Sequence, residues 1–146
     1  MSRASVHGLP MTDRENERLV RSLVADVLND KRYDAVTTCC HEDVVMHRPG
    51  DLDEVGQDAY IEHYRHLHRT FPDFQATIKD VLADDDRIGL RLALTGTHED
   101  ELLGRAPTGT SVAFSAQIIY RLSNGRIVEE WHESDRLGLL RQLGEW

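Results

Sequence analysis

The spacing of apolar residues changes once along the chain, from a helical period before Pro72 to a strand-like period of two after it. Before Pro72, the segment "TDRE" at 12–15 has the form of a capping box, in which Thr12 caps a helix and Glu15 reaches back to it. Apolar residues follow at helical spacing as far as Leu28. The pattern predicts a long helix from Thr12 to about Asp30, a shorter helix at 33–40, a short strand at 44–46, and a third helix at 57–71 that Pro72 ends.

The second half of the chain is predicted to form four strands, at 74–83, 87–98, 110–122 and 126–134, before a last short helix at 135–143. Helices and strands thus occupy separate parts of the chain. This order indicates an α+β fold with a mostly antiparallel, strongly bent sheet wrapped by helices. A bent sheet closed over a helix leaves a cone-shaped cavity, which is the default position for a small ligand.

Composition limits the partners of this protein. Its 146 residues suffice for one domain, expected at 12–146 after a flexible tail at 1–11. A formal net charge of −9 and an isoelectric point near 5.3 oppose binding to nucleic acid or to an anionic membrane. We find no secretory or transit signal and no apolar run of about 20 residues, so we expect a cytoplasmic protein. Arg far outnumbers Lys, a composition typical of a GC-rich bacterial genome, and the adjacent Cys39 and Cys40 are expected to be buried free thiols.

Three segments, in this order, resemble the SnoaL-like polyketide cyclases of the nuclear transport factor 2 superfamily. They are "FPDF" after the third helix, "GTHEDELLGRAPTG", and "NGRIVEEW" followed by "DRLGLLRQLG". The resemblance extends from Asp13 to Gly144. It implies a cone-shaped α+β barrel, a homodimer formed through the sheet, and cofactor-independent chemistry on a hydrophobic polyketide bound inside the cone. In the best-known members, one buried carboxylate acts as acid and base while an intramolecular aldol addition closes a ring.

The resemblance also implies positions for the site, and the most important of them is changed here. Aligning the "NGR" turn and the "LLRQLG" ending places His132 where the aldol cyclases have their catalytic Asp, and Ile118 where they have a partner His. Asp135 matches a second family Asp, and His98 matches the His of the "GTH" turn. An imidazole therefore replaces the catalytic carboxylate of the family.

Two hairpin registers are compatible with the turn between the last two strands. A three-residue loop at 123–125 puts even-numbered residues of both strands on one face, whereas a two-residue Asn-Gly turn sets Trp131 beside Ile118. We favour the three-residue loop because it agrees with the resemblance. The residues that would then share one face are Ile118, Tyr120, Val128, Glu130, His132 and Ser134.

His132 is the leading candidate for catalysis. An imidazole, with an ordinary pKa of about 6.5, can take a proton from a carbon beside a carbonyl or deliver one to the new alkoxide. Glu130 or Asp135 could orient the ring or hold its proton. The alternatives are that His132 is a structural histidine lining the pocket and that Asp135 is simply the N-cap of the last helix.

A second group of side chains is predicted to contact the substrate, although aromatic residues at these spacings are also typical of plain core. From their positions in the pattern these are His47, Tyr60, Tyr64, Phe71, Phe114 and Tyr120, and the resemblance adds His98 and Ile118.

The segment "HYRHLHR" at 63–69 raises the question of a metal site. Its three histidines do not share one helix face, and no carboxylate or Cys completes a ligand set, so we expect a solvated polar face and no metal. No phosphate-binding loop, nucleophile elbow or CxxC motif is found, and we expect no cofactor.

The first hypothesis is therefore a cofactor-independent polyketide cyclase that closes a carbon ring by an aldol-type or cycloaddition-type step. Two alternatives remain: another cofactor-free enzyme on the same fold, such as an isomerase, epoxide hydrolase or hydroxylase, and a non-catalytic binding or assembly module. A deep apolar cone lined by His132 would favour an enzyme. A pocket filled by Tyr120, Phe114 and leucines would favour a scaffold.

Overall fold

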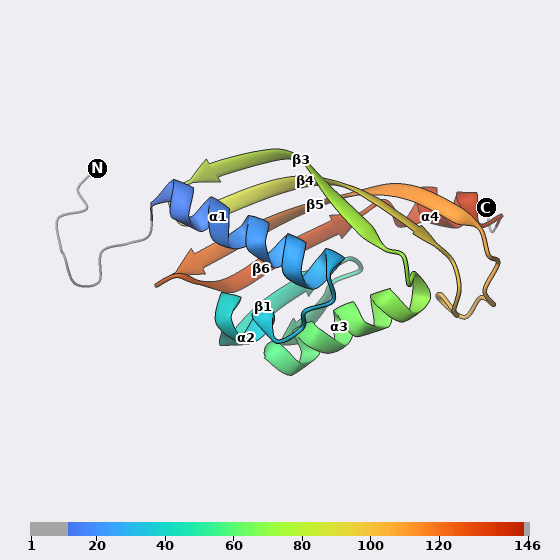
Figure 1. Cartoon of the computed structure of the whole chain (residues 1–146), viewed down its shortest axis with the longest axis horizontal. Coiled ribbons are helices and arrows are strands. Elements are labelled where there is room, and N and C mark those ends of the chain that lie inside the picture. Colours follow the sequence, from blue (N-terminus) through green and yellow to red (C-terminus); the bar gives the residue numbers. More distant parts are fainter. Residues whose placement is uncertain (1–11, 145–146) are drawn as a thin grey trace.

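The computed structural model describes residues 12–144, and within this range six strands form one curved sheet (Figure 1). Their spatial order is β2-β1-β6-β5-β4-β3, and all neighbouring pairs are antiparallel except β1 with β6. The predicted α+β fold with a mostly antiparallel, bent sheet is confirmed, while the predicted tail at 1–11 lies outside the described residues. The strands are β1 (Cys40–Arg48), β2 (Leu52–Val55), β3 (Gln75–Asp84), β4 (Arg87–Thr97), β5 (Ser111–Ser123) and β6 (Arg126–Ser134).

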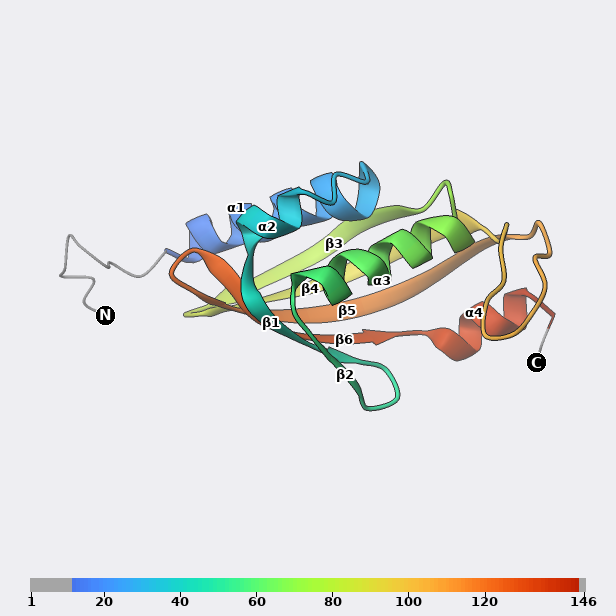
Figure 2. The same cartoon turned by 90° about the horizontal axis from the view of Figure 1, so that it is seen from below.

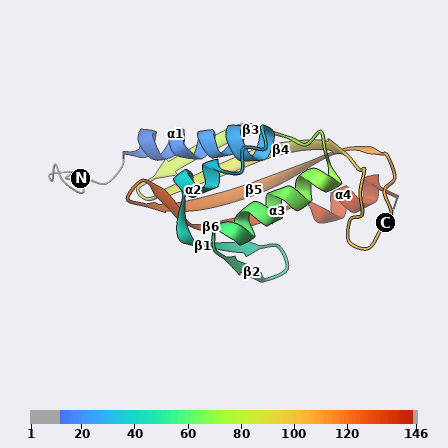
Figure 3. The ribbon, with the colours of Figure 1, turned by 60° about the horizontal axis from the view of Figure 1, so that its bottom comes forward.

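Helices cover one side of the sheet. They are α1 (Asp13–Leu23), continued by a π-helical segment η1 (Val24–Asn29), then α2 (Ala35–Cys39), α3 (Gln57–Thr70) and α4 (Arg136–Gln142). Figures 2 and 3 show α1, α2 and α3 on the same side, with α1 contacting β3 and β4 and α3 contacting β1 and β2. The short α4 packs against β5 at the opposite end of the molecule from the start of α1. The apolar faces of α1, α3 and the sheet therefore enclose one interior.

The first helix forms as its sequence predicts. Thr12 and Glu15 make both bonds of the capping box: the Glu15 N–H donates to Thr12 Oγ1 (3.1 Å), and the Thr12 N–H donates to Glu15 Oε1 (2.9 Å). At the other end, Asn29 exchanges two hydrogen bonds with the main chain of Ala76, of 3.0 and 2.7 Å. The bonds of Asn29 fix this end of the first helix to β3.

The β5–β6 hairpin reaches the predicted register by a different route. Its turn has only two central residues, Asn124 and Gly125, whose φ angles of 52° and 75° are those of a type I′ turn, so the predicted three-residue loop is wrong. A β-bulge then inserts Val128 as one extra residue of β6, and beyond it Ile118 pairs with His132. The bulge reverses the parity that the short turn imposes. His132 therefore faces inward as predicted, whereas Ile127, and not Val128, takes the buried position near the turn.

Two strands differ from the prediction. β1 is much longer than 44–46, because it pairs with β6 on one side and β2 on the other. β2 was not predicted, because its short sequence "LDEV" contains two acidic residues. In the structure it is mostly exposed and lies at the edge of the sheet, where it pairs with β1 and contacts α3.

Two further predictions concern burial and the membrane. Cys39 and Cys40 are buried and free, as expected, and burial raises the pKa of both thiols. Among residues 12–144, no helix combines the length and the apolar character needed to cross a membrane.

Candidate functional site

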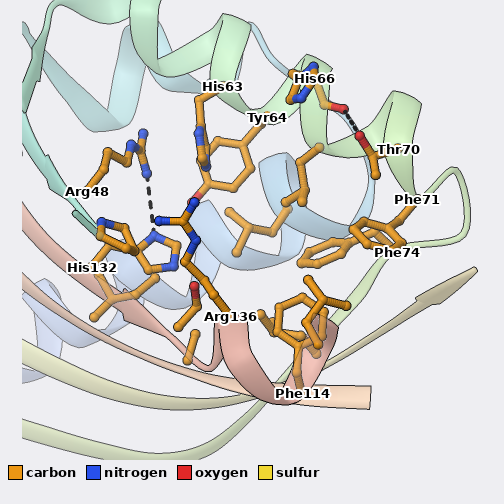
Figure 4. Close-up of a pocket in the computed structure, with 18 of the residues that line it drawn as sticks. Arg48, His63, Tyr64, His66, Thr70, Phe71, Phe74, Phe114, His132 and Arg136 are labelled. Carbon is orange, nitrogen blue, oxygen red and sulfur yellow. Dashed lines mark hydrogen bonds between the residues drawn. The ribbon is translucent and has the colours of Figure 1, made fainter. Parts of the chain in front are cut away.

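A cavity of about 520 Å³ lies between α3, the inner face of the sheet and the start of α4 (Figure 4). This volume is within the ~300–1,000 Å³ typical of small-molecule sites. Side chains from five strands and three helical segments line it, together with the β1–β2 turn and Leu102 and Leu103 of the β4–β5 loop. The predicted cavity is thus present and is not filled by core side chains.

One end of the cavity is apolar. Phe71, Phe74 and Phe114 gather there (Figure 4), and Leu92 and Leu94 of β4 also line the cavity, with Leu94 paired to Phe114 in the sheet. Phe71 packs closely against Gly96, which has no side chain. A Cβ added to Gly96 would lie 2.8 Å from the Phe71 Cβ. A larger residue at position 96 would push this wall into the cavity.

The other end is polar and rests on a buried ion pair. Glu130 is fully buried, accepts a hydrogen bond of 2.7 Å from the Tyr60 hydroxyl, and lies 3.3 Å from Arg48 Nη1. Arg48, also buried, donates from Nε to Glu54 (3.2 Å) and has its guanidinium 5.7 Å from the ring centroid of Tyr60. Burial raises the pKa of Glu130 against the opposing charge of Arg48. The pair therefore fixes the guanidinium at the cavity wall.

His132 lines this polar end, directly above the ion pair. Its Nδ1 lies 3.4 Å from Arg48 Nη1, and its side chain is only 13% exposed. Burial, reinforced by the charge of Arg48, lowers the pKa of His132 to about 4. The imidazole is therefore neutral at pH 7. Because a guanidinium can only donate, Nδ1 must accept, which places the ring proton on Nε2.

Of the three histidines of "HYRHLHR", only His66 is exposed, so the solvated face that we expected is formed only in part. His68 is buried, with its Nδ1 2.7 Å from the Tyr33 hydroxyl and its Nε2 2.7 Å from the Leu28 carbonyl oxygen, so it links α3 to the first helix. His63 lines the cavity, edge-on to Tyr64 and 6.3 Å from His132 between ring centroids. Burial lowers the pKa of His63 well below its ordinary value. Within residues 12–144, no group of His, Cys, Asp and Glu could hold a metal ion.

Apart from His47, the predicted site residues divide into three groups. Tyr64, Phe71, Phe114, Ile118 and His132 line the cavity. Glu130, Tyr60, Tyr120 and His98 are fully buried behind its wall, so they are placed to support the lining and do not reach a ligand directly. Asp135 is the N-cap of α4, accepting a hydrogen bond from the Gly138 N–H (2.9 Å), and does not line the cavity.

The prediction that His47 points into the mouth of the cone is wrong. His47 is paired with Trp131 in the parallel β1–β6 register, so it lies on the outer face of the sheet. There it stacks on Trp131 and bonds Asp53 (2.9 Å) and Glu129 (2.7 Å), and these bonds raise its pKa. The inward position next to it belongs to Arg48.

Sequence reasoning missed two arginines of the site, Arg48 and Arg136. For Arg48 a signal existed, because Val44 and Met46 alternate inward along β1 and position 48 continues that face. Arg136 is the first residue of α4 and enters the cavity from the opposite side (Figure 4). Nothing in its sequence context distinguishes it from a solvated helix residue.

With this geometry in place, the family is clear: the model of the SnoaL-like polyketide cyclases matches residues 18–143, and the chain belongs to this family. AclR from Streptomyces galilaeus, for which hydroxylase activity has been suggested, is 27% identical with a TM-score of 0.82, over 92% of this chain and 84% of AclR. IdmH from Streptomyces antibioticus, suggested to be a polyketide cyclase, is 26% identical with a TM-score of 0.79, over 88% of this chain and 98% of IdmH. TsrD from Streptomyces laurentii shares the fold at 23% identity, with a TM-score of 0.83 over 93% of this chain and 99% of TsrD. No curated protein sequence matches the chain.

Proposed function

We propose that this protein is a cofactor-independent cyclase that closes a carbon ring in a polyketide bound within the cavity. The observation that carries the proposal is the cavity itself, which is apolar at one end and presents Arg48, His63 and His132 at the other. A hydrophobic chain with several carbonyl groups fits both ends. Holding its reacting ends together can contribute roughly 7–11 kcal/mol at best. An open cavity lined by His132 also favours an enzyme over a non-catalytic scaffold.

His132 acts in this proposal as a hydrogen-bond donor and not as a base. With Nδ1 accepting from Arg48 and the proton on Nε2, the neutral ring has no free lone pair to take a proton from carbon. Its Nε2–H can instead donate to an oxygen that gains negative charge in the transition state. In the fold, Arg48 and Glu130 are the positioning residues that select this tautomer.

The donor role serves both types of ring closure. In an aldol closure, Glu54, which lines the cavity beside Arg48, accepts the proton from the carbon next to a carbonyl. The resulting enolate carbon then forms a bond to the second carbonyl carbon, and the alkoxide formed there is stabilised by His132 and takes the proton back from Glu54. In a cycloaddition-type closure no proton moves, and the same donor polarises a carbonyl of the electron-poor partner.

Gene disruption tests the function. The strain lacking the gene is expected to accumulate an uncyclised or wrongly cyclised polyketide, identified by mass spectrometry, and the intact gene should restore the product. An unchanged metabolite profile would contradict a cyclase role.

Complementation with variants of position 132 tests the mechanism. Glutamine carries an amide N–H close to the place of the imidazole Nε2–H, so His132→Gln should retain a substantial part of the turnover, whereas His132→Phe should lose at least tenfold. His41→Gln is the matched control, because His41 lies outside the cavity and accepts a hydrogen bond from the Asp43 N–H. If His132→Gln were as inactive as His132→Phe while both remained folded, His132 would be acting as a base.

A second candidate is a cofactor-free hydroxylation, which the similarity to AclR favours. Incubation of the isolated substrate under ¹⁸O₂, with a two-electron reductant present to reduce the second oxygen atom to water, separates the two reactions. A cyclase yields a product without the label, and a hydroxylase yields a product that has gained one labelled oxygen atom.

The homodimer implied by the resemblance is also proposed here. The outer face of the sheet presents Ile119, which is 45% exposed, next to the His47–Trp131 stack. Sedimentation equilibrium should give twice the chain mass, and Ile119→Arg should shift it toward the monomer. A monomer at tens of micromolar would contradict the dimer.

A further inference from the structure

The polar end of the cavity contains more hydrogen-bond donors than the described part of the chain satisfies. Arg48 Nη2 and the Tyr64 hydroxyl are both buried, and neither has a hydrogen-bond partner within residues 12–144. They adjoin one another, since the Arg48 guanidinium lies 6.0 Å from the Tyr64 ring centroid. Buried donors without acceptors cost free energy, so an acceptor supplied by a ligand would be stabilised there.

Arg136 adds an exposed positive charge that no residue within 12–144 neutralises. Its side chain extends from α4 toward the polar end of the cavity, which His63 and His132 also line (Figure 4). Across the mouth it packs near the β1–β2 turn, because a Cβ on Gly50 would lie 3.6 Å from Arg136 Nη1. Among the described residues, Arg136 forms no ion pair.

The carboxylates that line the same region are already engaged. Glu54 accepts from Arg48 Nε, and Asp53 accepts from His47 Nδ1 at the rim. His63 and His132, which line this end of the cavity, are neutral at pH 7 because burial lowers the pKa of both. The free cation at this end of the cavity, within residues 12–144, is therefore Arg136.

We infer that this end of the cavity is a subsite for an anionic oxygen on an otherwise apolar ligand, bound by Arg136 and by the unsatisfied donors of Arg48 and Tyr64. The chemical class is a carboxylate or the ionised enol of a 1,3-dicarbonyl, since both present a planar, charged acceptor to a guanidinium. The inference deepens the proposed function, on which it rests for the use of the cavity as a substrate site. It identifies the substrate as an acidic polyketide and not a fully neutral one.

Titration calorimetry of the whole chain tests the subsite with probes matched in shape. The probes are 2-naphthoate and its neutral counterpart 2-naphthamide, together with the anion of 2-phenylindane-1,3-dione and neutral 2-phenylindane. The wild-type protein is expected to bind each anion at least tenfold more tightly than its neutral counterpart, and to lose part of this preference as salt is raised. The pair with the larger preference tells whether a carboxylate or an enolate is the better ligand.

Variants assign the preference to its residues. Arg136→Gln should remove most of the preference for the anionic probes while leaving the affinity for the neutral probes within about twofold. Arg136→Lys should retain part of this preference. Arg141→Gln, an exposed arginine on the same helix that does not line the cavity, should change neither. Tyr64→Phe should reduce the preference without removing it.

Three results would overturn the inference: equal binding of charged and neutral probes, an Arg136→Gln effect of the same size on both, or a loss of preference in Arg141→Gln. If the neutral probes bind and the anions do not, the subsite is refuted while the cavity remains a ligand site and the proposed function stands. If no probe binds, both are contradicted.

Discussion

Removal of Arg48 gives the sharpest test of the buried ion pair under the cavity. Arg48→Met keeps the length of the aliphatic stem but leaves the fully buried Glu130 without its cation. Removing one member of a buried pair typically costs about 3–5 kcal/mol. The salt bridge of Arg48 to Glu54 adds little, because the Glu54 side chain is 41% exposed.

The stability lost in Arg48→Met must also depend on pH, and the direction of this dependence follows from the pKa of Glu130. Burial raises the pKa of Glu130 in the folded protein, so the native state holds this proton more tightly than the unfolded chain. Stability contributed by Glu130 is therefore lost as pH rises from the unfolded pKa through the folded one. Without Arg48, which opposes the rise, the folded pKa moves higher and the loss continues to higher pH. The free energy of unfolding lost by Arg48→Met should thus grow with pH, by at most about 1.4 kcal/mol per unit.

Urea unfolding between pH 6 and pH 8.5 measures this difference. The same substitution in a Glu130→Gln background serves as the control, since glutamine imitates the protonated acid. There the cost should fall to about 1–2 kcal/mol, for the contacts of the guanidinium with the rings of Tyr60 and Tyr64, and should not vary with pH. An equal cost of Arg48→Met in both backgrounds, or at both ends of the pH range, would refute the reasoning.

Three further predictions concern the cavity walls and α4. Asp135→Ala removes the cap on the Gly138 N–H and should cost about 0.5–2 kcal/mol in urea unfolding with little change in turnover, so a large loss of turnover in a folded variant would give Asp135 a role beyond capping. Gly96→Ala brings a methyl group against Phe71 and should lower the free energy of unfolding by about 1–3 kcal/mol and weaken ligand binding. An unchanged melting temperature would show that Phe71 moves aside without cost. Ala116→Leu fills part of the cavity from β5 and should lower turnover at least tenfold without lowering stability, whereas full activity would place the reaction elsewhere.

The fold could be predicted largely from the sequence because its signals are local. The capping box at Thr12 and the alternation along β4 each depend on a few neighbouring residues, and both appear where expected. The edge strand β2 could not be predicted in this way, because its pairing partner and not its own composition makes it a strand. The bulge at Val128 likewise depends on how β6 meets two neighbours.

The site was harder to predict because it depends on charges brought inside by long-range pairing. Aromatic positions such as Phe71 and Phe114 follow from periodicity and line the cavity. Arg48 is buried only because Glu130, 82 residues away, lies beside it, and a sequence pattern does not contain that partner. His47 was misplaced for the related reason that the parallel β1–β6 register decides which of two adjacent polar residues turns inward.

The bulge in the β5–β6 hairpin decides which ring of β6 reaches the cavity. If β6 kept Val128 but paired without a bulge, the ladder beyond Leu122 would slip by one residue and exchange the imidazole of His132 for the indole of Trp131. Deleting Val128 would instead remove the bulge and leave His132 opposite Ile118. A relative that is one residue shorter here can therefore keep the same inward side chain, provided that an alignment places its gap at the bulge.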